Sequence, residues 1–155
     1  MAKHGLTKAD AFARRLAKPL AFKVKALHME IIRYKREHET AVLAAIKEDP
    51  NWDIFTNEGA IDKYRKRLRE SITYFCYEGD TFSGYLRALL DDGFAIYISE
   101  LFVVPEMRNR KIGRTLISKL KSDFSNLTVY ALSDEDIYYE KLSYKKAGSV
   151  FEINQ

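Results

Sequence analysis

The hydrophobic positions of the chain change their spacing near residue 71. Before that point apolar residues recur at helical intervals, as in AIDKYRKRLRES, where Ile61, Tyr64 and Leu68 share one face. After it come three segments rich in β-branched and aromatic residues, SITYFCYEGD, TFSGYLRALLDDG and FAIYISELFVV. Short turns containing Gly79-Asp80 and Asp92-Gly93 separate them. We therefore predict three strands paired as an antiparallel meander, the third buried on both faces.

The first 70 residues predict mainly helix. Thr7 can cap a helix over KADAFARRLAK that ends at Pro19. The pattern of AFKVKAL, residues 21–27, fits either a strand with one wet face or part of a long helix. EHETAVLAAIKEDP predicts a helix that ends at Asp49-Pro50.

The segments after the meander alternate between helix and strand. KIGRTLISKLKSDF predicts a helix and LTVYAL a short buried strand. With the strand over 94–104 they predict a right-handed βαβ unit. DEDIYYEKL predicts a helix of about two turns, and YKKAGSVFEINQ predicts a closing strand with a break near Gly148. The expected fold class is α/β (α+β), in one domain of 155 residues.

Composition narrows the class of protein. Hydrophobic residues make up 46% and charged residues 31%, which suits a folded, water-soluble domain. No apolar run approaches the ~20 residues of a membrane span, and the N-terminus lacks the apolar stretch of a secretory signal. With Cys76 as the single cysteine, we expect a cytoplasmic protein. His4, His28 and His38 show no metal-ligand spacing, so we expect no metal site.

Positive charge is unevenly distributed. The net charge is +4, and residues 1–40 hold ten Lys/Arg against four acids. Such a segment can bind nucleic acid or an acidic partner. A solvated helix face explains it more simply, because the chain holds no recognised nucleic-acid-binding motif. The five basic residues of the segment 61–70 have the same interpretation.

The stretch PEMRNRKIGRTL, residues 105–116, combines a strand end, a basic turn and a helix start. A helix N-terminus carries unpaired backbone N–H groups and partial positive charge, so it binds anions. The chain contains neither the P-loop pattern nor the dinucleotide-binding glycine pattern. On charge and position alone, a phosphate site and a solvated basic helix cap are both open.

The motif ELFVVPEMRNRKIGRTLISKL resembles the acetyl-CoA-binding motif of the GNAT N-acetyltransferase superfamily, a strand and a proline followed by [RQ]-x-x-G-x-[GA]. Arg108 stands at the Arg/Gln position and Gly113 at the second glycine position. IYYEKLSYKKAG resembles the family's second signature, F-Y-E-K-L-G-F. The resemblance covers roughly residues 71–150. It implies a mostly antiparallel sheet with a central splayed parallel strand pair, an N-terminal strand and flanking helices.

The resemblance also implies acetyl-CoA as co-substrate and direct transfer of its acetyl group to a primary amine. A bulge near Leu101–Val103 would splay the third strand from the strand over 127–132, so that pantetheine pairs with exposed backbone groups. The Val103 N–H would stabilise the oxyanion. The implied cofactor-binding residues are Phe102, Val103, Val104, Arg108, Asn109, Arg110, Lys111, Ile112, Gly113, Arg114 and Thr115.

Two residues are expected to move protons. Glu100, a carboxylate in an otherwise apolar strand, is the candidate general base; equally, it can be exposed or paired with an arginine. Tyr139 matches the signature tyrosine, which implies the general acid that protonates the departing thiolate. Otherwise Tyr138 and Tyr139 are ordinary packing aromatics.

The sequence departs from the family pattern in three places. Lys111 replaces the first glycine, which would cost roughly 1–2 kcal/mol if φ is positive there. Ser143 replaces the glycine of the second signature. The asparagine usual early in the last helix is absent, and Ser133, Asp134 and Asp136 stand nearby.

Three functions compete. The first is an active N-acetyltransferase and the second a non-catalytic CoA-binding or regulatory module of the same fold; a nucleic-acid-binding protein ranks last. The acceptor amine is not identified. It would be cationic if the acids of the turns and the third strand converge: Asp80, Asp91, Asp92, Glu100 and Glu106. We expect no membrane partner, and a homodimer in which a second chain supplies a strand edge.

Overall fold

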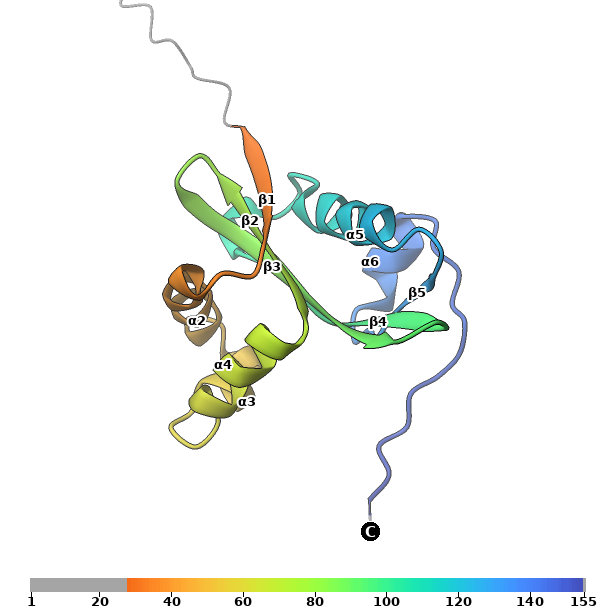
Figure 1. Cartoon of the computed structure of the whole chain (residues 1–155), viewed down its shortest axis with the longest axis horizontal. Helices are drawn as coiled ribbons and strands as arrows, with labels where there is room; N and C mark the ends of the chain where they lie inside the picture. The colour runs from red at the N-terminus through yellow and green to blue at the C-terminus, as the bar shows by residue number, and fades with distance from the viewer. Residues whose placement is uncertain (1–27, 155) are drawn as a thin grey trace, which may run out of the picture.

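The computed structural model describes residues 28–154, and a twisted five-stranded sheet runs through them (Figure 1). The strand order is β1-β2-β3-β4-β5, so each strand lies beside its neighbours in sequence. The elements in chain order are β1 (Met29–Arg33), η1 (Arg36–His38), α2 (Glu39–Lys47), η2 (Pro50–Trp52), α3 (Asp53–Thr56), α4 (Ile61–Glu70), β2 (Ile72–Glu78), β3 (Thr81–Asp91), β4 (Ala95–Val103), η3 (Pro105–Met107), α5 (Ile112–Asp123), β5 (Thr128–Ala131) and α6 (Asp136–Lys141).

Strands β1 to β4 pair antiparallel. The turns between β2, β3 and β4 use Gly79 (φ 60°) and Gly93 (φ 81°), where a residue with a Cβ would be strained. The predicted meander is therefore confirmed. β1 is the N-terminal strand that the family resemblance implies, although no local pattern located it at residues 29–33.

Helices cover both faces of the sheet: α5 and α6 one face, and α2, α3 and α4 the other (Figure 1). Each face has its own hydrophobic core. Under α5, the sheet residues Leu86, Ile96 and Ile98 pack against Ile112, Leu116 and Leu120 of the helix. Under α2–α4, the sheet residues Phe75, Tyr85 and Phe102 pack against the helix residues Val42, Ile46, Tyr64 and Leu68. Adjacent strand residues serve opposite cores because side chains alternate along a strand. Each such buried side chain contributes roughly 1.5–3 kcal/mol.

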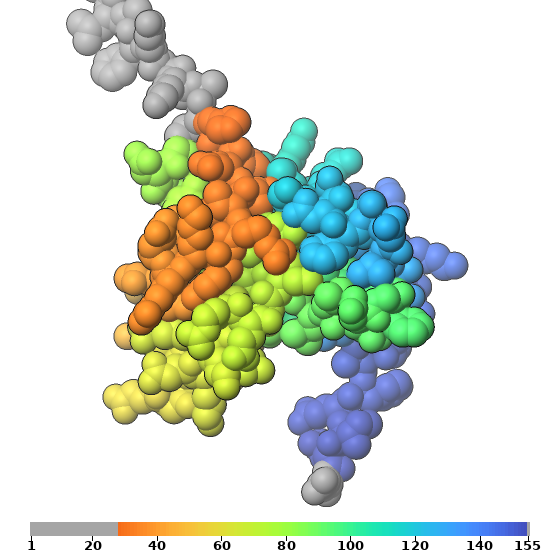
Figure 2. All heavy atoms as spheres, in the orientation of Figure 1, coloured from red at the N-terminus to blue at the C-terminus, as the bar shows by residue number. Residues whose placement is uncertain are grey.

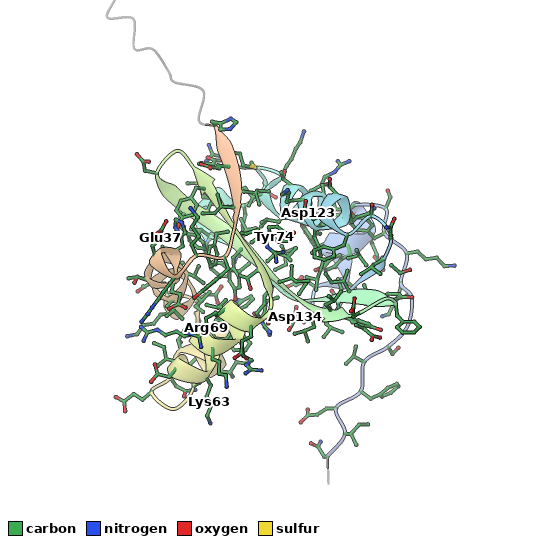
Figure 3. All side chains as sticks on the ribbon, in the orientation of Figure 1. Glu37, Lys63, Arg69, Tyr74, Asp123 and Asp134 are labelled. Carbon is green, nitrogen blue, oxygen red and sulfur yellow. The ribbon has the colours of Figure 1, made fainter. Side chains whose placement is uncertain are left out.

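Helix α4 shows why its sequence is both basic and amphipathic. Tyr64 and Leu68 are buried, whereas its five lysines and arginines are exposed, including Lys63 and Arg69 towards its two ends (Figure 3). The expectation of a solvated basic face is confirmed. Across the sheet, the Tyr74 hydroxyl donates to Asp123 of α5 at 2.5 Å (Figure 3), which ties this helix to β2.

The predicted βαβ unit is present. Residues Ala95–Ile98 of β4 pair in parallel with Thr128–Ala131 of β5, and α5 connects the two strands. β5 was expected to be buried, but Thr128 and Tyr130 are exposed. The reason is that β5 is the outermost strand of the described sheet, and α2–α4 do not extend over it.

The closing strand predicted for YKKAGSVFEINQ is not formed. Residues 144–154 adopt neither helix nor strand. Tyr144 still packs against the core and Lys146 pairs with Asp136, and only the end of the segment projects from the body of the protein (Figures 1 and 2). A strand needs a neighbour for its backbone groups, and this segment has none in the described part of the chain. The predicted helix after Thr7 and the ambiguous segment 21–27 lie outside the described residues.

Candidate active site

The turn between β4 and α5 presents an unbroken row of backbone donors. No acceptor in residues 28–154 binds the six consecutive N–H groups from Asn109 to Arg114; the first helical bond of α5 runs from Thr115 N to Lys111 O. Asn109 (φ 64°) and Lys111 (φ 65°) both have left-handed backbone conformations. Such a turn at a helix N-terminus directs successive N–H groups at one point and forms an anion-binding concavity.

Gly113, the next family glycine position, lies against the second signature. A Cβ at Gly113 would overlap the Tyr138 hydroxyl of α6. The two sequence motifs are therefore in direct contact, and any side chain at position 113 would have to displace Tyr138. Packing, and not backbone conformation, favours glycine here, because Gly113 has no positive φ.

Carboxylates from other parts of the fold hold two arginines of the turn. Arg108 Nη2 lies 3.5 Å from Asp49, just after α2, and Arg108 Nε donates to the Val103 carbonyl at 3.2 Å. Arg110 Nη1 lies 2.7 Å from the buried carboxylate of Glu78 at the end of β2. Lys111 and Arg114 are exposed and have no ion pair with the described residues, so the turn keeps net positive charge.

The parallel strands separate beside this turn. Their pairing ends at Ile98 and Ala131, with one further bond from Leu132 N to Ile98 O. Here β4 carries a bulge, because Arg87 pairs with Glu100 but Ala88 pairs with Ile98. The extra residue is Ser99, so the bulge expected near Leu101–Val103 is real but lies earlier in the strand. Its effect is as expected, since in the sheet formed by residues 28–154 no strand lies on the β5 side of β4 beyond Ser99.

Alternation along β4 decides which backbone groups enter this gap. Val104 N bonds to Ser83 O of β3, so Val104 and, two residues back, Phe102 direct their backbone groups towards β3. Leu101 and Val103 direct theirs into the gap. The Phe102 side chain packs between Trp52 and Tyr85, with ring centroids 5.2 and 6.0 Å away. Leu101 is thus a gap-lining position that the sequence did not single out.

Glu100 lies at the centre of a buried polar network on the α4 side of the sheet. Its carboxylate accepts from Arg87 Nε at 2.6 Å, from the Tyr64 hydroxyl at 2.7 Å and from the Ser99 hydroxyl at 3.1 Å, and it also pairs with Arg87 Nη2. Glu100 is 6% exposed and Arg87 8%. These four hydrogen bonds occupy the acceptor positions of a carboxylate. Glu100 is therefore paired with an arginine, one of the arrangements that the sequence left open.

The two signature tyrosines have different surroundings. The Tyr139 hydroxyl has no hydrogen-bond partner among the described residues, and burial, followed by the neighbouring Tyr138 and Asp134, raises its pKa to about 12. Burial also raises the pKa of Tyr138. Both phenols are neutral at pH 7. Tyr139 thus offers a free O–H donor, whereas Tyr138 packs against the start of α5.

The acids that we considered for binding a cationic amine do not converge. Asp80 lies in the turn before β3, and Asp91 and Asp92 lie at its other end. Eleven strand residues at ~3.3 Å each put roughly 35 Å between those ends. Glu106, the fifth of these acids, lines a hollow of about 570 Å³ where α2 ends beside η3, together with Glu48 and Asp49.

Four polar residues of the site were missed from the sequence: Asp49, Tyr64, Glu78 and Arg87. Arg87 left a signal, because it is a charge inside the apolar run SGYLRALL, as Glu100 is in the following strand. Two opposite charges buried in adjacent strands predict a pair. Asp49 and Tyr64 left none, since only helix packing brings them to the sheet.

Comparison with known proteins agrees with this geometry. The family model described as "Acetyltransferase (GNAT) domain" matches residues 35–155. The chain belongs to the GNAT acetyltransferase family. No curated protein matches it.

Solved GNAT structures share the fold at low sequence identity. An aminoglycoside N-acetyltransferase, AAC(6')-Iy in complex with CoA, is 14% identical with a TM-score of 0.64, covering 83% of this chain and 95% of that one. An aminoglycoside acetyltransferase from an uncultured soil sample is 21% identical (TM-score 0.64, coverage 83% and 99%). A ribosomal-protein-alanine N-acetyltransferase from Brucella melitensis is 15% identical (TM-score 0.65, coverage 83% and 99%). These similarities confirm the fold class, a mostly antiparallel sheet with one parallel pair.

Proposed function

We propose that this GNAT acetyltransferase transfers the acetyl group of acetyl-CoA to a primary amine. The observation that carries the proposal is the row of six free N–H groups from Asn109 to Arg114, next to the opened β4–β5 pair. A diphosphate carries several acceptor oxygens and negative charge, which suits this turn. An extended amide chain suits the unpaired edge of β4.

The residues present fit acetyl-CoA. The N–H groups of the turn and the Arg108 side chain would hold the pyrophosphate, with Lys111 and Arg114 adding positive charge. The backbone groups of Leu101 and Val103 would hold pantetheine. Within the described residues, no helix is both long and apolar enough to cross a membrane.

Acetyl-CoA supplies the thioester that the amine attacks and a thiolate leaving group. The Val103 N–H, directed into the gap, would stabilise the oxyanion, as predicted from the resemblance. Tyr139 would donate its free hydroxyl to the departing sulfur. Because its pKa is about 12, Tyr139 is protonated at neutral pH. It would therefore stabilise the thiolate mainly by donating a hydrogen bond to the sulfur, and less by transferring its proton completely.

The amine must lose a proton, since a lysine-type ammonium has a pKa of ~10.4. Glu100 remains the proposed base, but the geometry adds a condition: one of its four hydrogen bonds must be released first. Tyr64 is the group that can release it, because its hydroxyl can bond to Tyr85, 2.5 Å away. A Glu100→Gln variant that keeps its affinity for acetyl-CoA, but loses as much turnover above pH ~10.4, where the amine is already neutral, as it loses at pH 7, would contradict a base role.

Isothermal titration with acetyl-CoA tests the cofactor site. We expect micromolar binding, weakened about tenfold to a hundredfold in Arg108→Ala, the range for a hydrogen bond to a charged group. Arg65→Ala, on the exposed face of α4, is the matched control and should bind as the parent does. Absence of binding by the parent protein would overturn the proposal.

The acceptor screen follows from the structural neighbours. Two act on aminoglycosides and one on ribosomal-protein alanine, so the screen includes aminoglycosides, peptides with N-terminal alanine and polyamines, with released thiol as the readout. The second candidate function is a non-catalytic CoA-binding module. The saturated Glu100 carboxylate favours it. Tight binding without turnover on any amine would support it.

A further inference from the structure

The side chain of Arg110 is directed away from the opened β4–β5 pair. Its Nη1 lies 2.7 Å from the Glu78 carboxylate at the end of β2, and it also contacts Met107 Sδ at 2.9 Å. In the strand order, β2 and β3 lie on one side of β4, and the gap beside β5 lies on the other. The guanidinium therefore extends to the side of β4 opposite the gap.

The burial of Glu78 holds this ion pair together. The Glu78 side chain is 7% exposed, and in the part of the chain that the structure describes Arg110 is the one cation paired with it. A buried carboxylate that loses its cation is strongly destabilised, because neither water nor another charge compensates it. The Arg110 side chain is 46% exposed and would be solvated without the pair. The need to compensate Glu78 thus fixes where the Arg110 side chain lies.

The backbone on both sides of Arg110 is strained. Asn109 and Lys111 have φ values of 64° and 65°, in the left-handed region. Such conformations persist where the surrounding structure holds them. The N–H groups of this turn do not hold it, because they bind no acceptor in residues 28–154. The Arg110 side chain, which lies between the two strained residues, supplies a contact with the sheet instead.

Arg108 is held in a different way. Its contact with Asp49 is longer, at 3.5 Å, and its side chain is 53% exposed. Asp49 also accepts from the Asn51 N–H at 3.1 Å, so it keeps a partner if Arg108 moves. Arg108 can therefore turn to a bound phosphate without leaving a buried charge unpaired, whereas Arg110 cannot leave Glu78 in the same way.

We propose that Glu78 and Arg110 are positioning residues of the cofactor site. Their ion pair holds the turn in the conformation that directs its N–H groups at the pyrophosphate, and Arg110 contributes its backbone N–H to the ligand but not its guanidinium. The identity of the ligand rests on the proposed function, whereas the ordering of the turn does not. A site whose competent conformation is populated in part binds its ligand more weakly by that fraction.

Titration with CoA separates this role from direct phosphate binding by Arg110, because the two predict opposite effects of Glu78→Gln. If the pair positions the turn, Glu78→Gln and Arg110→Ala should each weaken CoA binding about tenfold. The double variant should then bind no more weakly than Arg110→Ala alone. If the guanidinium binds phosphate, Glu78→Gln frees it and tightens binding. Binding by Glu78→Gln that is as tight as that of the parent, or tighter, would overturn the proposal.

Glu106→Gln is the matched control. Glu106 is exposed in η3, and its replacement removes the same negative charge from beside the turn. This variant should bind CoA at least as tightly as the parent, because it leaves the Glu78–Arg110 pair intact. Equal weakening in Glu106→Gln and Glu78→Gln would overturn the proposal.

NMR relaxation of the ligand-free full chain tests the ordering of the turn without the cofactor. The amide order parameters of residues 109–111 should be about 0.85 in the parent and in Glu106→Gln. They should fall below about 0.6 in Glu78→Gln and Arg110→Ala, while those of β2 and α5 stay unchanged. Unchanged order in Glu78→Gln would overturn the proposal. If the parent binds no CoA but both variants lose order, the proposed function fails and the positioning of the turn by this pair stands.

Discussion

Replacing Lys111 by glycine should stabilise the protein. Lys111 has φ 65° and ψ 8°, and it makes no ion pair with the described residues. The left-handed conformation costs a residue with a Cβ roughly 1–2 kcal/mol. Glycine gives back part of this gain, because it loses more backbone entropy on folding, about 0.5–1 kcal/mol. We therefore expect a net increase of about 0.5–1 kcal/mol in the free energy of unfolding.

Urea denaturation measures this change, and thermal unfolding should show a midpoint higher by about 2–4 °C per kcal/mol at this chain length. Lys111→Ala is the critical control, because it removes the charge but keeps the Cβ. It should leave stability nearly unchanged. If Lys111→Ala stabilises the protein as much as Lys111→Gly, relief of charge repulsion in the turn is the cause and the backbone argument is refuted.

Three further predictions concern the site. Gly113→Ala should lower the free energy of unfolding, measured in urea, by about 1–3 kcal/mol through overpacking against the Tyr138 hydroxyl. Adding Tyr138→Phe to this variant should restore part of the lost stability. If it restores none, the hydroxyl is not the obstacle. Arg87→Ala should cost about 3–5 kcal/mol because it leaves the buried Glu100 carboxylate unpaired, and a loss below 1 kcal/mol would contradict the network. Burial raises the pKa of Tyr139 from 10.0 to about 12 in the folded protein. Its contribution to the free energy of unfolding is therefore complete below pH 10 and is lost as pH rises towards 12. The free energy of unfolding of Tyr139→Phe should fall less steeply over this pH range, and an identical pH profile of the variant and the parent would argue against this burial.

Much of the fold followed from local patterns. Period-two segments gave the meander, and the helical spacings of α4 and α5 gave their buried faces, because these patterns report which side of an element meets a core. We predicted that Lys111 would cost stability if its φ were positive, and its φ is positive in the structure. Ser143, which replaces the glycine of the second signature, also has a positive φ (63°).

The polar partners of the site could not be derived in the same way. Arg87 and Glu100 are opposite one another only because a bulge at Ser99 shifts the register of β3 and β4. Tyr64 reaches Glu100 only because α4 packs across that sheet face. Likewise, the strand character of SVFEI is local, but a strand exists only where a neighbour accepts its hydrogen bonds.

The sequence by itself determined the meander, the helices α4 and α5, the basic turn between β4 and α5, and the two motifs that mark the family. These depend on residues within a few positions of one another, where spacing and backbone preference act directly. Tertiary structure decided that Glu100 is saturated, that Asp49 and Glu78 hold Arg108 and Arg110, and that β5 is the outermost strand of the described sheet. Those outcomes depend on register and helix packing, which bring together residues up to dozens of positions apart and which no local pattern encodes.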